Sequence, residues 1–445
     1  MFRERFFTLG IALIASIMLN ACNRTEAVAV MDSPPNKAPS VSAGTKGADA
    51  TIRFLEERVK RDPEDFIAYN KLSGEYLQRV RETGDIAYLD LASKAANASL
   101  AVLPAEQNKG GLIALAQVEY SSHDFAAARD HAQQLTKLDP GKGFYFQMLG
   151  DSLLELGQYD DGAAAFKQME SLGGLQGLTR AAMEQRLARL ALLHGDNKGA
   201  ASHFAAALKL AQALPEPPRE TVAWCQWQLG ETAYAEGQYA AAEKYYRDSL
   251  ATFPDYFRSL ASLGRVRAAQ GDLPGAIEQY EKVVKILPDP NFVASLGDLY
   301  AAAGHVNDAK TQYELVEQIG HLSTLSGTLY NRQLALFYAD HDMNSDTAYQ
   351  NASKEYEVRR DIYGADAVAW TALKAGKIPD AQAAIKDALK LGTKDARLYY
   401  HAGMIEKAAG NNPEAKRLLQ LALKTSPSFD LLQSAVAKTA LEALK

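Results

Sequence analysis

The stretch from Phe257 to Pro288, FRSLASLGRVRAAQGDLPGAIEQYEKVVKILP, decides the fold because its pattern of small and large residues returns elsewhere in the chain. Counted from Phe257, places 7, 8, 15, 20, 24 and 32 hold Leu263, Gly264, Gly271, Ala276, Tyr280 and Pro288. Counted from Ala223, the same places hold Leu229, Gly230, Gly237, Ala242, Tyr246 and Pro254. Counted from Ala396, they hold Ala402, Gly403, Gly410, Ala415, Leu419 and Pro427. The chain therefore contains an internal repeat of about 34 residues.

The spacing within the repeat predicts a pair of packed helices. Places 4, 7, 8 and 11 share one face of a helix, and places 20, 24 and 27 form the matching stripe of a second helix. A small residue at place 8 allows the second helix to approach closely, and the large residue at place 24 fills the remaining volume. The glycine at place 15 suits the end of the first helix, and the proline at place 32 cannot continue the second.

This pattern resembles the tetratricopeptide repeat, and the resemblance covers about four-fifths of the chain. About ten units are expected, some of them irregular, starting near Phe66, Lys109, Gly143, Ala181, Ala223, Phe257, Pro290, Thr328, Ile362 and Ala396. Each unit leaves an apolar face that only a stacked neighbour can bury. The sequence therefore predicts an all-α fold, an α-solenoid over residues 50–427 with a capping helix over residues 428–445. The apolar face of that last helix would consist of Leu431, Leu432, Val436, Leu441 and Leu444.

The N-terminus has the features of a secretory signal. Arg3 and Arg5 precede an apolar run, Phe6–Leu19, that is too short to span a bilayer comfortably. The run ends in Leu-Asn-Ala-Cys, which resembles a bacterial lipobox, so residues 1–21 are predicted to be a lipoprotein signal and Cys22 to carry lipid. The alternatives are an ordinary cleaved signal with an incidental cysteine and a cytoplasmic protein with an apolar N-terminus.

Residues 22–49 are rich in Ser, Pro, Ala, Thr and Gly and predict a disordered tether between the lipid and the repeats. In lipoproteins an aspartate directly after the lipidated cysteine often retains the protein at the inner membrane, and this chain has Asn23 there. We therefore expect a lipid-anchored protein of the bacterial cell envelope, at the outer membrane and facing the periplasm.

The net charge and the cysteine content limit the classes of partner and the covalent links that we expect. The formal net charge is −6 and no long basic run is present, so we expect no nucleic acid partner and no adhesion to a membrane through a basic face. Only one cysteine besides Cys22 exists, Cys225, which we expect to pack as a small apolar residue without a disulfide.

The sequence contains none of the common catalytic motifs, so we expect no enzyme activity, no cofactor and no small-molecule substrate. Asp340, Asp342, Asn344 and Asp346 begin like a calcium-binding loop. The sixth place of such a loop requires Gly and the twelfth Glu, whereas this chain has Ser345 and Asn351 there. A solvated turn is the better interpretation, and no metal site is predicted.

The resemblance implies that places 2, 5, 9 and 12 of each first helix face the concave surface of the superhelix. In the unit from Ala223 these places hold Trp224, Trp227, Glu231 and Tyr234, and the neighbouring units contribute Gln185, Arg189, Arg258, Arg265 and Asp298. Aromatic residues flanked by arginines are typical of a binding hot spot. The alternative is that both tryptophans pack on the connection 215–218 or on a neighbouring helix. A second set comprises Tyr363, Trp370, Arg397 and Tyr400.

Taken together, these features predict a membrane-tethered, non-catalytic scaffold that binds protein or peptide partners in the concave groove. The alternative hypothesis is a polysaccharide-binding protein or a component of an export complex at the cell envelope, because aromatic groove residues suit glycans as well as peptides.

Overall fold

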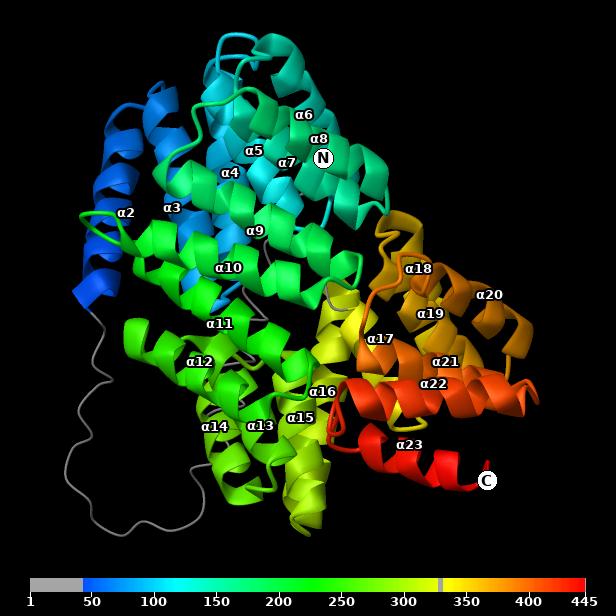
Figure 1. Cartoon of the computed structure of the whole chain (residues 1–445). Helices are drawn as coiled ribbons and strands as arrows, with labels where there is room; N and C mark the ends of the chain where they lie inside the picture. The colour runs from blue at the N-terminus through cyan, green and yellow to red at the C-terminus, as the bar shows by residue number, and fades with distance from the viewer. Residues whose placement is uncertain (1–42, 327–330, 445) are drawn as a thin grey trace, which may run out of the picture.

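The computed structural model describes residues 43–326 and 331–444, and these parts of the chain form 22 α-helices and no strand (Figure 1). The helices are α2 Ala43–Arg61, α3 Phe66–Thr83, α4 Ala87–Val102, α5 Lys109–Ser121, α6 Phe125–Leu138, α7 Gly143–Glu155, α8 Tyr159–Ser171, α9 Gly177–Leu193, α10 Asn197–Gln212, α11 Arg219–Ala235, α12 Tyr239–Thr252, α13 Phe257–Ala269, α14 Leu273–Ile286, α15 Pro290–Ala302, α16 Val306–Ser326, α17 Asn331–Asp340, α18 Ser345–Val358, α19 Ile362–Lys374, α20 Ile378–Ala388, α21 Ala396–Ala408, α22 Asn412–Thr425 and α23 Gln433–Glu442.

Consecutive helices pair as hairpins, α3 with α4 and so on to α21 with α22, and α2 and α23 flank the array. The predicted all-α solenoid of about ten hairpins is confirmed. Predicted unit starts coincide with the first residue of a helix at Phe66, Lys109, Gly143, Phe257, Pro290, Ile362 and Ala396. The unit predicted near Thr328 begins outside the described residues.

Packing within each hairpin follows the small-large pattern of the repeat. The ring of Tyr280 lies directly over Gly264, and a Cβ added to that glycine would lie 2.6 Å from Cδ2 of Tyr280. Gly230 and Tyr246 repeat the arrangement in the preceding hairpin. A side chain at place 8 would therefore force the two helices apart, at a cost of about 1–3 kcal/mol.

The solenoid coils so tightly that its successive turns touch. Three hydrogen bonds join residues that are 204, 203 and 200 positions apart, namely those of Glu155 with Arg359, Tyr159 with Ile362 and Leu193 with Thr393. A separation of about 200 residues corresponds to six hairpins of about 34 residues. The chain therefore completes one superhelical turn in about six hairpins, and in Figure 1 the orange and red helices α19–α22 lie beside the green helices α9–α12.

Gly157 and Gly195 are among the hairpin glycines that lie at this contact between turns. Gly157 and Gly195 have φ values of 73° and 71°, in the left-handed region that favours glycine. A Cβ on Gly157 would fall on the carbonyl oxygen of Arg360, and one on Gly195 would lie 2.5 Å from the carbonyl oxygen of Gly392. These glycines thus end a helix and also admit the backbone of the next turn.

An apolar core also joins the two turns. Leu154 and Met183, of α7 and α9, belong to one buried cluster with Ile362, Ile385 and Leu398 of α19–α21. Removal of apolar side-chain surface from water stabilises the folded chain by about 25 cal/mol per Å². The turns are therefore held together by packing as well as by polar contacts.

The end helices cover the open faces of the array. Ile52 and Leu55 of α2 are buried against α3. In α23, Ala437 and Ala440 are buried, whereas Val436 of the predicted apolar face is 43% exposed. The prediction that Val436 belongs to the apolar face was wrong, because it assumed one continuous helix from residue 428. Helix α23 begins at Gln433, after an irregular stretch, so the predicted helical register does not apply.

The structure describes only part of the N-terminal region in which the sequence predicted a signal segment and a tether. Helix α2 begins at Ala43, within the segment 22–49 predicted as a tether. The signal segment 1–21 and Cys22 lie outside the described residues. Within the parts that are described, no helix combines the length and the apolar character needed to cross a membrane.

Candidate functional site

A cavity of about 730 Å³ lies inside the superhelix. Residues before and after the connection from α8 to α9 line it on different sides. We call α2–α8 the N-terminal lobe and α9–α23 the C-terminal lobe, and the hollow between them the interlobe cavity. Its wall includes, from the N-terminal lobe, Gln78, Arg81, Tyr120, Asp151, Leu154 and Tyr159, and from the C-terminal lobe Gln185, Arg186, Arg189, Thr221, Trp224, Gln228, Arg359, Asp361 and Tyr363. The first helices of five consecutive hairpins thus converge on one space.

Another hollow, of about 530 Å³, is formed by α6, α7 and α8. It lies within the N-terminal lobe, and its wall combines Leu, Gln and Ala side chains with Phe146, Arg129, Asp130 and Asp161. The interlobe cavity is larger and brings together aromatic, amide and guanidinium groups from distant parts of the chain, so it is the better candidate site.

Helix α11 places three polar side chains on one stripe of the cavity wall. Thr221, Trp224 and Gln228 follow a spacing of three and four residues and therefore share a helix face. Within the parts of the chain that are described, none of the three side chains has a hydrogen-bond partner. Their donors and acceptors remain available to a ligand.

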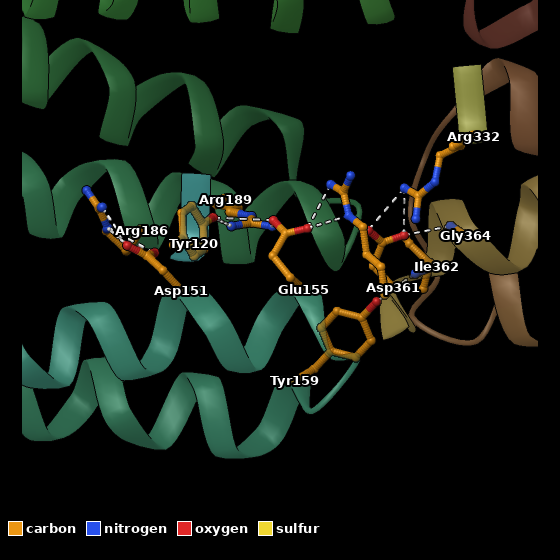
Figure 2. A network of polar contacts seen from close by, with 11 residues as sticks. Tyr120, Asp151, Glu155, Tyr159, Arg186, Arg189, Arg332, Asp361, Ile362 and Gly364 are labelled. Carbon is orange, nitrogen blue, oxygen red and sulfur yellow. Dashed lines mark hydrogen bonds and ion pairs between the residues drawn. The ribbon is translucent and has the colours of Figure 1, made fainter. Parts of the chain in front are cut away.

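The opposite wall is a network of ion pairs, which Figure 2 shows from close by. Arg189 and Arg359 both bind the carboxylate of Glu155, and the pair with Arg359 measures 2.7 Å between Nη2 and Oε2. Nε of Arg359 also lies 2.9 Å from Oδ2 of Asp361, which Arg332 contacts at 3.1 Å. We call Glu155, Arg189, Arg359 and Asp361 the Glu155 clasp, because it joins the two lobes.

The clasp keeps Glu155 ionised. Burial raises the pKa of this carboxyl, but the positive charges of Arg189 and Arg359 outweigh burial and lower the pKa to about 2. Its side chain is 7% exposed, whereas that of Arg189 is 35% exposed and faces the cavity. Arg189 is therefore both a partner of Glu155 and a donor that a ligand can reach.

Three of the nine predicted groove residues line the interlobe cavity, namely Gln185, Arg189 and Trp224. Gln185 Nε2 lies 3.5 Å from Sγ of Cys225, and its Oε1 accepts a hydrogen bond from Arg186. The Trp224 ring packs edge-on against Phe204, at 5.9 Å between ring centroids.

Trp227 and Arg258 lie together outside the cavity. The indole Nε1 of Trp227 donates a hydrogen bond of 3.0 Å to Oγ of Ser262 on the neighbouring helix α13. The guanidinium of Arg258 stacks over Trp227 and over Phe257, at 5.4 Å and 4.9 Å from the ring centroids. Trp227 thus packs on a neighbouring helix, as the alternative interpretation of the sequence expected.

The remaining predicted residues make contacts within the C-terminal lobe. Glu231 and Arg265 form an ion pair of 2.6 Å, and Arg265 lies 4.1 Å from the centroid of the Tyr234 ring. Tyr234 donates a hydrogen bond of 2.9 Å to the carbonyl oxygen of Ser428 in the next turn. Asp298 accepts hydrogen bonds from Tyr313 and His341, both at 2.8 Å.

Several cavity residues were not among the candidates from the sequence. Gln228 had a usable signal, because it follows Trp224 by one helical turn. Arg359 had none, since it lies on the connection between α18 and α19 and reaches the cavity only through the contact between turns. In the second set, Tyr363 lines the cavity, whereas Trp370 and Tyr400 are buried in a core cluster.

The loop that begins like a calcium site is occupied by internal contacts. Asp340 accepts a hydrogen bond of 2.8 Å from the Trp370 indole, and Asp342 pairs with Lys374 at 2.6 Å. No group of three or more potential metal ligands is assembled among the described residues. Cys225 is buried, and burial raises the pKa of its thiol to about 11, so it is uncharged at neutral pH.

Fold and site together define a protein built as a repeat α-solenoid whose first helices enclose an inner surface. Family models of the tetratricopeptide repeat match residues 113–170, 228–289 and 368–428, and another match covers residues 178–255. The chain belongs to the tetratricopeptide-repeat family, whose fold serves as a scaffold for protein–protein interaction. A search of curated proteins finds no match.

Several solved structures are similar to the chain. PilW, a widely conserved type IV pilus biogenesis factor, is 18% identical with a TM-score of 0.39, over 46% of this chain and 91% of that chain. A Rap protein complexed with Competence and Sporulation Factor is 15% identical with a TM-score of 0.48, over 77% and 98%. The human IFIT1 dimer with m7Gppp-AAAA is 13% identical with a TM-score of 0.49, over 77% of each chain. These similarities concern the fold alone.

Proposed function

We propose that this protein is a non-catalytic scaffold, tethered to a membrane of the bacterial cell envelope through lipid on Cys22, and that it binds an extended segment of a partner protein in the interlobe cavity. The observation that carries the proposal is the cavity itself, with its unpaired polar stripe on α11 opposite a wall of arginines. The outer membrane, facing the periplasm, is the proposed location.

The size of the cavity favours a segment over a folded domain. About 730 Å³ falls within the range of roughly 300–1,000 Å³ that is usual for ligand sites, which is far less than the volume of a domain. An extended chain carries its amide groups at every residue and needs donors and acceptors along its path. The side-chain amide of Gln228, which has no hydrogen-bond partner among the described residues, supplies both kinds of group.

The lining also indicates how a segment would be selected. Arg186 pairs with Asp151 at 2.6 Å, and Arg189 and Arg359 pair with Glu155, so the charges of the wall are largely balanced. Recognition would therefore depend on hydrogen bonds and on apolar contact with the rings of Trp224 and Tyr363, more than on net charge.

The binding site is tested by substitution of the α11 stripe. Wild-type protein and the double variant Trp224→Ala, Gln228→Ala are compared for capture of partner proteins from envelope extract, with partners identified by mass spectrometry. The proposal expects partners that the wild type captures and the double variant loses, while helix content by circular dichroism is unchanged. Gln212→Ala, at the exposed end of α10, is the matched control and should retain them. Equal capture by the double variant would place the binding site elsewhere.

The tether is tested separately. Because the thiol of Cys22 would be the site of lipid attachment, Cys22→Ala is expected to move the protein from the membrane fraction to the aqueous fraction. Cys225→Ala is the control and should stay with the membrane. A Cys22→Ala protein that still sediments with membranes would contradict the lipid anchor.

A further inference from the structure

The two lobes are joined by a connection that has the features of a hinge. Between α8 and α9 the chain contains Gly173, Gly174 and Gly177, with φ values of 70°, 67° and 50°. A Cβ added to Gly173 or Gly174 would meet no atom within 4 Å, so nothing packs on these two glycines, and Leu175 is the residue of this stretch that packs against the buried cluster. Helices α8 and α9 also pack against each other far less than α6 and α7 or α10 and α11 do.

The polar contacts between the lobes concentrate at one end of the cavity. Asp151 pairs with Arg186, Glu155 pairs with Arg189 and Arg359, and Tyr159 accepts a hydrogen bond of 2.7 Å from the amide N–H of Ile362. Figure 2 shows these side chains in a continuous row from α9 to the connection before α19. The apolar cluster that contains Leu154 and Ile362 also joins the two lobes.

The interlobe cavity has one wall in each lobe, so its width depends on how the lobes sit relative to each other. Gln78, Arg81 and Tyr120 belong to the N-terminal lobe, whereas Trp224 and Gln228 belong to the C-terminal lobe. Closure of two bodies about a short hinge is a common way to enclose a ligand.

We propose that the interlobe cavity opens and closes by rotation of the N-terminal lobe about residues 173–177, and that the Glu155 clasp holds it closed. This inference rests on the proposed function, since the motion would admit the partner segment. Glu155 suits the role of a latch because one buried carboxylate holds guanidiniums from two separate regions of the other lobe. Removing that single charge takes away the one ion-pair partner that both guanidiniums share in the N-terminal lobe.

The motion is measured without a ligand, by distances between pairs of spin labels in the full chain carrying Cys22→Ala. Lys94→Cys on α4 and Lys310→Cys on α16 report the distance between lobes, since both lysines are at least 68% exposed. Lys244→Cys with Lys310→Cys gives a distance within the C-terminal lobe. Cys225 is buried, and protein without introduced cysteines shows that it remains unlabelled.

Glu155→Gln is expected to add a second, longer population to the distance between lobes, while the distance within the C-terminal lobe stays as in the wild type. Arg359→Gln should act in the same direction and serves as a second variant if Glu155→Gln unfolds. Glu231→Gln removes a comparable ion pair with Arg265 inside one lobe and should leave both distances unchanged.

An unchanged distance between lobes in folded Glu155→Gln and Arg359→Gln would overturn the inference. Equal broadening of both distances would overturn it as well, because that result means general loosening rather than hinge rotation. Neither result bears on whether partners bind in the cavity, since the partner-capture comparison of the α11 stripe decides that question independently.

Discussion

Glu155 and Arg359 are 204 residues apart in the sequence and form an ion pair of 2.7 Å that joins two turns of the superhelix. Because Arg189 binds the same carboxylate, Glu155→Gln leaves Arg189 without its ion-pair partner and Arg359 with Asp361 alone. We expect a loss of about 3–5 kcal/mol, read from urea denaturation at neutral pH. Glu414→Gln, in an exposed pair with Arg417, should cost less than about 1 kcal/mol. Equal effects would show that the clasp adds nothing beyond a surface pair.

The low pKa of Glu155 gives the protein a pH dependence in acid. Folding lowers this pKa from 4.5 to about 2, so ionised Glu155 stabilises the fold at pH values above 4.5. That stabilisation is lost progressively as the pH falls from 4.5 to 2. The slope of stability against pH in this window should be smaller in Glu155→Gln than in the wild type, and identical slopes would contradict the role of the carboxylate.

His123 should add a separate dependence at higher pH. Burial, and then the positive charges of Arg359 and Arg332, lower its pKa from 6.5 to about 4, and the carboxylates of Glu155 and Asp361 oppose this only in part. The unfolded chain binds a proton below pH 6.5 and the folded chain does not, so stability decreases as the pH falls from 6.5 to 4. The loss is on the order of 2–3 kcal/mol over the full window.

Asparagine is the matched substitution for His123, because it does not titrate and tolerates the left-handed backbone found there, with φ 63°. His123→Asn should reduce the change in unfolding midpoint between pH 6.5 and 4.5 and leave the change below pH 4, which belongs to Glu155. A variant with the same profile as the wild type over the upper window would assign that window to another group.

Replacing a hairpin glycine by alanine should cost more stability where another turn packs on that glycine. Gly157, Gly195 and Gly376 share φ values of 71–73°, but a Cβ on Gly376 would meet nothing within 4 Å. Gly376→Ala should cost only the backbone strain, about 1–2 kcal/mol. Gly157→Ala and Gly195→Ala should cost a further 1–3 kcal/mol, because the methyl group meets backbone of the next turn. Equal costs in denaturation experiments would argue against close packing of the turns.

Two tyrosines should stabilise the same contact between turns. The hydroxyl oxygens of Tyr159 and Tyr239 accept hydrogen bonds of 2.7 Å from the amide N–H groups of Ile362 and Ser428. Phenylalanine at either position leaves an amide without a partner, at a cost of about 1–3 kcal/mol. Tyr245→Phe is the control, because its ring packs beside a cluster with Phe204 and Leu229 and no hydrogen bond of its hydroxyl is found among the described residues. Amide exchange at Ile362 should also accelerate in Tyr159→Phe, and unchanged exchange there would refute the bond.

The repeat pattern was sufficient to predict the hairpins because each depends on residues close in sequence. Gly264 and Tyr280 lie 16 places apart and meet within one hairpin, so their spacing alone predicts the contact. The same phase placed Gln185, Arg189 and Trp224 on the inner surface, where the structure has them.

The superhelical pitch could not be predicted in this way. It is the sum of small rotations between neighbouring hairpins, and no local pattern encodes that sum. Arg359 was missed for this reason, and Tyr234 was predicted to face an open groove although it contacts Ser428 of the next turn. A partial signal was present, since tyrosine stands two places after Gly157 and Gly237, and the uncovered tips at Gly271 and Gly376 have Leu273 and Ile378 there. Gly195, which the next turn also covers, has Asn197 at this place and does not follow the signal.

The central claim, that a partner segment lies in the interlobe cavity, is tested most directly by photo-crosslinking in cells. A photoreactive amino acid is placed at Gln228, on the α11 stripe, and in a parallel strain at Gln212, on the exposed end of α10. Crosslinks from position 228 that map by mass spectrometry to a contiguous segment of one partner, and are absent from position 212, are the predicted result. Partner crosslinks from position 212 with none from position 228 would contradict the account.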